Sequence, residues 1–157
     1  MKNDIPNFES IALEVDRIID QHLSTLQFIP EDKFYFKPSP TKWSKKEILG
    51  HLVDSAQSNI RRFIVAQYEE QPKIVYNQDK WVALTNYQQY KLPDLISLWY
   101  LLNKHICHLL KNITPEMAAR KVTAIYLLLP SLAFFRDSCQ NSVGQLIFLA
   151  KSSRCSV

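Results

Sequence analysis

Histidine is the residue type in this chain best suited to chemistry, because imidazole nitrogens are common ligands of divalent metals. The chain has four histidines: His22, His51, His105 and His108. His51 lies on the border between the apolar and polar faces of a predicted helix, and the same flank continues with Ser55, Ser58 and Arg62. We therefore expect His51 either to face a polar pocket between helices, which Asp54 and Arg62 would help to line, or to lie in water.

A single imidazole at position 51 does not hold a divalent ion, since an open zinc or nickel site needs about three protein ligands. His22 lies within the apolar stripe of the first predicted helix, and we interpret it as a core histidine held by hydrogen bonds. His105 and His108 are three residues apart on a later helix, so both rings have the spacing to reach one metal. A helical wheel places His108 on the polar side of that helix, which favours a solvated pair, and Cys107 points elsewhere. For this pair to replace missing ligands, both rings would have to converge on His51.

The segment around His51 also carries a family resemblance. Residues 42–56 read KWSKKEILGHLVDSA, and this stretch resembles the DinB-like (YfiT-like) superfamily, whose second helix typically begins Trp-Ser/Thr-x-x-Glu-Ile-x-x-His-Leu. Shorter stretches at residues 79–82, 86–87, 94–99 and 112–116 are similar to a bacterial branch of that superfamily. The resemblance covers about residues 8–123.

The resemblance implies an antiparallel four-helix bundle, often dimeric, that holds zinc or nickel with three histidines at one end. It also implies a metal-dependent hydrolase or a thiol transferase that uses a bacillithiol-type cofactor, with a small-molecule substrate or thiol as partner. By the family pattern His51 matches the first ligand, and the other two come from a His-x-x-x-His pair late in the fourth helix. No histidine follows His108 in this sequence, so neither of the other two ligands can be assigned.

Hydrophobic spacing predicts an all-α chain without strands. Apolar residues recur at intervals of three and four in three segments, which we predict as helices over residues 8–28, 44–70 and 92–112. Asp4 or Asn7 is suited to cap the first of them, and Ser44 with Glu47 forms a capping box at the start of the second. We expect a proline-marked loop over residues 29–42 and a long connection over residues 72–92, with a short helix near residues 79–90.

The C-terminal part differs in composition from the rest. Residues 124–157 carry four charged side chains, whereas residues 1–123 carry 30. The apolar residues of this tail come in blocks instead of at helical spacing. We therefore predict a helical domain over residues 1–123 and a divergent tail over residues 124–157, with the fourth helix aberrant or poorly formed. We interpret this tail as a segment that did not evolve with the rest of the chain, as after a frameshift or an assembly error. The alternative interpretation is a fully buried helix.

Composition excludes several classes of function. With two glycines, the chain has no phosphate loop or glycine-rich dinucleotide turn. The net charge of +4 is scattered, which argues against nucleic-acid binding. The apolar run at residues 124–135 is too short to span a membrane, and the N-terminus resembles no signal peptide. Three widely spaced cysteines form no disulfide framework and indicate a reducing cytoplasm.

The sequence therefore predicts a DinB-like protein that is inactive as a hydrolase or transferase, because two of its three expected ligands are missing. Whether the chain is an enzyme stays open at this point. The alternative hypothesis is a non-catalytic helical homodimer, or a frameshifted remnant without metal. In either case no nucleic acid and no membrane is expected as a partner.

Overall fold

The computed structural model describes residues 7–69 and 72–114. Every regular element in these two ranges is helical, as the sequence predicts, and they follow in the order α1 (Phe8–Gln27), α2 (Glu31–Tyr35), α3 (Lys45–Val65), α4 (Gln78–Thr85), the 3-10 helix η1 (Tyr87–Gln89) and α5 (Leu92–Lys111). The predicted tail over residues 124–157, the fourth long helix and the domain boundary at residue 123 lie outside the described residues.

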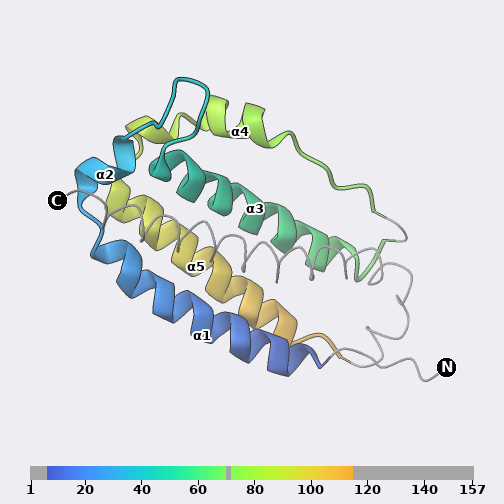
Figure 1. Ribbon diagram of the computed structural model, residues 1–157. Coiled ribbons are helices and arrows are strands. Elements are labelled where there is room, and N and C mark those ends of the chain that lie inside the picture. Colours follow the sequence, from blue (N-terminus) through green and yellow to red (C-terminus); the bar gives the residue numbers. More distant parts are fainter. Residues whose placement is uncertain (1–6, 70–71, 115–157) are drawn as a thin grey trace.

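The three long helices form one layer, with α5 between α1 and α3 (Figure 1). α1 runs antiparallel to the other two, whereas α3 and α5 run in the same direction (Figure 1). Two parallel neighbouring helices cannot be joined by a short turn, because the chain must first return along the whole length of α3. Residues 72–91, which we call the crossover, make this return and carry α4 and η1. The bundle is thus antiparallel at α1 but not between α3 and α5.

Local signals fix where the long helices begin. The Asn7 side chain accepts a hydrogen bond from the Ser10 amide at 3.0 Å and so caps α1. At α3 the predicted capping box is present, since Ser44 Oγ accepts from the Glu47 amide at 3.2 Å and Glu47 Oε2 accepts from the Ser44 amide at 2.7 Å. α5 begins with Pro93 in its first turn, where the missing N–H costs no helical hydrogen bond.

The core follows from the apolar stripes of these helices. α1 buries residues at spacings of three and four, and α3 and α5 do the same toward one another. Among the described residues, the most deeply buried large apolar side chains are Ile19, Leu26, Phe34, Leu49, Val53, Leu95, Ile106 and Leu110. Two apolar residues of α3, Ile48 and Ile60, are only half-buried and pack at the edge of this core.

Three predicted boundaries differ from the structure. The proline-marked loop contains the short helix α2, which buries Phe34. α3 ends at Val65 and not near residue 70, because a turn over Ala66 to Tyr68 interrupts the helix before Pro72. The single short helix predicted for the connection is two helices, separated by Asn86 in the left-handed conformation (φ 52°) that asparagine tolerates better than most residues.

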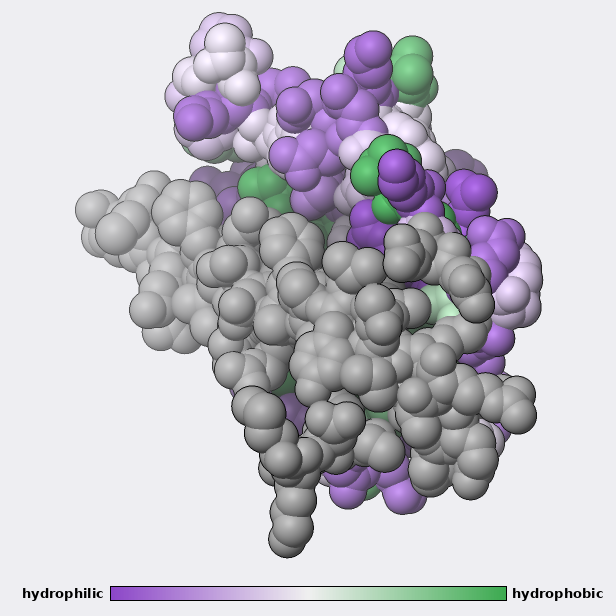
Figure 2. Space-filling view, turned by 90° about the vertical axis from the view of Figure 1, so that its right-hand side faces the viewer, coloured by the Kyte–Doolittle hydropathy of each residue, from purple (hydrophilic) through white to green (hydrophobic). Residues whose placement is uncertain are grey.

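Outside the core, α1 and α5 are joined by an ion-pair cluster. Lys104 Nζ lies 2.7 Å from both Asp16 Oδ1 and Asp20 Oδ1. None of the described helices combines the length with the apolar character that a membrane span requires. On the end of the molecule where α3 and α5 finish, the visible described surface is mostly hydrophilic, with hydrophobic residues in small separate patches (Figure 2).

Candidate functional site

A line of polar residues on α3 faces the crossover, and we call this contact region the polar seam. α3 contributes His51, Asp54, Ser55 and Arg62, and the crossover contributes Tyr76 and Tyr87. His51, Ser55 and Arg62 fall on one side of the helix because their spacings are close to whole turns. The predicted polar flank around His51 is thus covered by the crossover.

His51 is half-buried at one end of this seam. Its ring packs against Trp43, with the ring centroids 5.2 Å apart and the planes tilted by 39°. Its Nδ1 atom is buried and makes no hydrogen bond to any described residue. Burial lowers the pKa of His51, and the nearby Asp79 carboxylate opposes that shift. The imidazole is therefore held mainly in its neutral form, the form that binds a metal.

Asp54 lies three residues further along α3 and is 1% exposed. Its Oδ1 accepts a hydrogen bond from the Tyr87 hydroxyl at 2.5 Å, whereas its Oδ2 is buried without a partner among the described residues. Burial raises the pKa of Asp54, and the Tyr87 hydrogen bond partly offsets this. The pKa of Tyr87 is also raised, first by burial and then by the hydrogen bond to Asp54, so the phenol stays protonated and keeps donating.

Gly50 makes room for the ring of Tyr87. A Cβ atom built at position 50 would lie 2.1, 2.2 and 2.5 Å from three atoms of that ring, far inside van der Waals contact. Glycine lowers the stability of a helix interior by about 1 kcal/mol relative to alanine. Its presence in the middle of α3 is explained by this close approach, which brings the phenol within hydrogen-bonding distance of Asp54.

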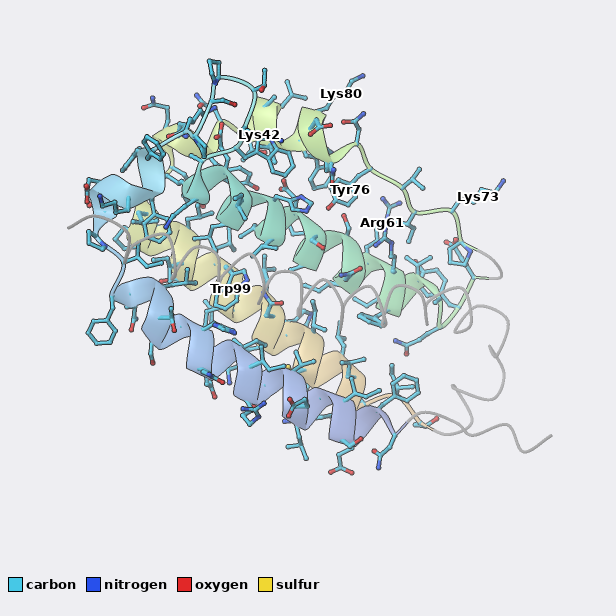
Figure 3. All side chains as sticks on the ribbon, viewed as in Figure 1. Lys42, Arg61, Lys73, Tyr76, Lys80 and Trp99 are labelled. Carbon is cyan, nitrogen blue, oxygen red and sulfur yellow. The ribbon has the colours of Figure 1, made fainter. Side chains whose placement is uncertain are left out.

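Further along the seam, Arg62 holds the first part of the crossover. Its guanidinium donates two hydrogen bonds to the carbonyl oxygen of Ile74, at 3.3 and 3.1 Å, and one to Asn59 Oδ1 at 2.9 Å. Tyr76 lies between the crossover and α3, whereas Lys73 and Lys80 point away from the bundle (Figure 3). Burial raises the pKa of Tyr76, and the nearby Ser55 hydroxyl partly offsets this. Arg62 therefore fixes backbone instead of presenting its charge to a ligand.

A third attachment joins the end of the crossover to the start of α3. Lys46 is fully buried, and its Nζ donates to the carbonyl oxygen of Gln88 at 3.1 Å and to the Tyr35 hydroxyl at 3.0 Å. The ammonium also lies 4.2 Å from the centroid of the Tyr35 ring, close enough for a cation–π contact. The side chain of Gln88 donates to Ser44 Oγ at 2.6 Å. The capping box is thus part of the same network.

The other histidines lie away from the seam. His105 and His108 are exposed on α5, with their rings stacked 6.3 Å apart, so the predicted surface pair is confirmed and its convergence on His51 is not. His22 is buried in α1 as predicted, but its Nδ1 makes no hydrogen bond to a described residue, contrary to the expected hydrogen-bonded histidine. Cys107 is buried in α5, and burial raises the pKa of its thiol to about 11.

The polar seam offers two donors with free atoms, the imidazole of His51 and the carboxylate of Asp54. Within residues 7–69 and 72–114, no group of three or more His, Cys, Asp or Glu side chains lies close enough to hold a metal. Because an open catalytic zinc site uses about three protein ligands, the described residues do not fit a divalent-metal centre.

Sequence reasoning found His51, Asp54 and Arg62 but missed the crossover residues that meet them. Tyr87 is 33 positions from Asp54, and no local pattern relates the two. The glycine was the available signal: Gly50 is one of two in the chain and lies inside a predicted helix, where it indicates a close approach of another side chain.

Comparison with known proteins gives one result that bears on this site. No curated protein and no solved structure matches the chain. The sequence model of the DinB superfamily, in contrast, matches residues 14–135, which is most of the chain and includes the whole of α3 and α5. The resemblance inferred from the segment around His51 is thereby confirmed, and the match extends beyond residue 123, where the inferred resemblance ended. This chain belongs to the DinB superfamily.

Proposed function

We propose that this chain is a non-catalytic member of the DinB superfamily, inactive as a metal-dependent hydrolase or as a bacillithiol-type transferase. The observation that carries the proposal is the isolation of His51. It is the one histidine of the four that lies in the polar seam, and no histidine follows His108 in the sequence. A zinc or nickel ion would therefore lack the imidazole ligands that the family resemblance implies.

The bonding of Asp54 supports the same proposal. Its Oδ1 is occupied by the Tyr87 hydroxyl, so at most Oδ2 is left for an ion. Two donors three residues apart on one helix leave a divalent ion with fewer protein ligands than the about three of an open catalytic site. The remaining bonds of the seam hold the crossover in place, which is a structural role.

Metal content tests the proposal directly. The purified full chain, incubated with zinc or nickel and then dialysed, is analysed by plasma mass spectrometry together with His51→Ala and, as a matched control, His105→Ala at an exposed position. We expect well under one equivalent of metal in all three proteins. One equivalent in the parent chain would overturn the proposal, whether His51→Ala removes it or leaves it in place.

A second candidate role, homodimerisation, is favoured by the surface of α4. Val82 is the one residue of this eight-residue helix that is buried, whereas Leu84 is 83% exposed and Trp81 is 39% exposed. Apolar side chains exposed together on one short helix are typical of a contact surface. We propose that a second copy of the chain covers α4.

Light scattering during size-exclusion chromatography tests the dimer. We expect the parent chain to elute with twice the monomer mass and Leu84→Lys to elute as a monomer. Leu13→Lys, which changes an exposed leucine on α1, is the matched control and should stay dimeric. A monomeric parent chain, or a dimer that Leu84→Lys leaves intact, would contradict this role.

A further inference from the structure

A cavity of about 610 Å³ lies between α1 and α5, away from the polar seam. It is an open cavity that the last turns of α1, the link between α1 and α2, and the first half of α5 line. We call it the α1–α5 pocket. Its volume falls in the range of roughly 300–1,000 Å³ that is typical of small-molecule sites.

The inner wall of the α1–α5 pocket is hydrocarbon. It is formed by four side chains that are all less than one-tenth exposed: Leu26, Ile29, Leu92 and Ile96. At the mouth, Leu101 is 62% exposed and extends the apolar surface toward solvent. A ligand with an apolar body would therefore bury the side that faces this wall, and burial of apolar surface favours binding.

The polar side chains of the lining are Gln27, Glu31, Ser97 and Tyr100, and Glu31 is the one among them that carries a charge. Glu31 lines the pocket, and its Oε1 accepts from the Tyr35 hydroxyl at 3.1 Å, which leaves Oε2 free; no described cation forms an ion pair with it. Ser97 donates its proton to the Pro93 carbonyl at 2.8 Å, so its oxygen is left as an acceptor. A carboxylate that no described cation neutralises favours a ligand with a cationic donor.

We propose that the α1–α5 pocket binds a small apolar amine, with its hydrocarbon part against the leucine and isoleucine wall and its ammonium group at Glu31. The pocket shares no residue with the polar seam, so this inference does not depend on the proposed function. Metal content and amine binding are separate measurements, and either result can fail alone.

Three probes of similar size test the charge preference: 2-phenylethylamine, 2-phenylethanol and phenylacetate. Each is titrated into the full chain and followed by saturation-transfer NMR. We expect the amine to bind most tightly, about fivefold better than the alcohol, since a solvent-exposed ion pair contributes modestly, and the carboxylate to bind least. Glu31→Gln should bring the amine down to the level of the alcohol, whereas Glu9→Gln, at an exposed carboxylate outside the pocket lining, should change nothing.

A second pair of variants tests the location. Ser97→Trp fills the pocket from its exposed rim and should abolish binding of all three probes, whereas Gln57→Trp, on the exposed surface of α3, should leave binding intact. The inference is overturned by equal affinity for the three probes, by no detectable binding, or by binding that survives Ser97→Trp. It is also overturned if light scattering shows a dimer that Ser97→Trp dissociates, because a second copy would then occupy the pocket.

Discussion

Substitution of Gly50 by alanine gives the sharpest test of how the polar seam is built. In an isolated helix the change would stabilise α3 by about 1 kcal/mol. Here the new Cβ would lie 2.1 Å from the ring of Tyr87, so the ring must move. Overpacking of this kind costs about 2 kcal/mol, and loss of the Tyr87 hydrogen bond to buried Asp54 costs about 2 kcal/mol more. The expected net loss is about 3 kcal/mol, or about 6–12 °C in Tm for a chain of this size.

The assay is urea unfolding followed by circular dichroism, applied to a double-mutant cycle with Tyr87→Ala. In that background the ring is gone, so Gly50→Ala should stabilise the protein by about 1 kcal/mol, the helix-propensity gain alone. The reversal of sign is the diagnostic result. If Gly50→Ala stabilises the parent chain as well, or destabilises both backgrounds equally, the ring of Tyr87 does not pack on Gly50 and the reasoning is refuted.

Two further predictions concern charges. Burial raises the pKa of Asp54 above its ordinary 3.8, so the folded state binds more protons than the unfolded state, and the stability that this proton contributes is lost as pH rises through the folded pKa. The unfolding free energy of Asp54→Asn should therefore increase relative to that of the parent chain as pH rises from 4 to 7. A difference between the two proteins that does not change with pH would contradict the burial argument. Lys104→Gln removes both contacts to Asp16 and Asp20 and should lower the unfolding free energy by about 1 kcal/mol at low salt and by less at high salt. The exposed ion pair of Arg17 with Glu14 supplies the control, since Arg17→Gln should have little effect. Equal losses of stability in the two variants would argue against the inter-helix cluster.

The parts of the fold that the sequence predicts are those fixed by neighbours in the chain. The capping box of Ser44 and Glu47 and the start of α5 at Pro93 depend on atoms within one helical turn, and both are present. The predicted end of the α3 helix near residue 70 is too late, since the chain leaves the helix after Val65. Once a helix passes the surface it packs against, its spacing pattern no longer decides where it ends.

Contacts between distant residues were out of reach for the same reason. The parallel direction of α3 and α5 depends on the path of the crossover, which sequence shows only as an unusually long connection. The partners of Asp54 and Lys46, Tyr87 and Gln88, lie 33 and 42 positions away. Periodicity identifies which face of a helix is buried but not which side chain will cover it. His51 and Asp54 could be named as candidates, but not the bonds that they make.

Those bonds decide what the polar seam is able to do. Lys46, Asp54 and Arg62 each attach a different part of the crossover to α3, through Gln88, Tyr87 and Ile74 respectively. These bonds add to the two side chains of the crossover that enter the hydrophobic core, Val82 and Tyr87. The atoms used in this way, Lys46 Nζ, Asp54 Oδ1 and the Arg62 guanidinium, are engaged by the crossover, whereas Asp54 Oδ2 has no partner among the described residues. Lys46, Asp54 and Arg62 therefore hold the crossover against the same face of α3 that presents His51.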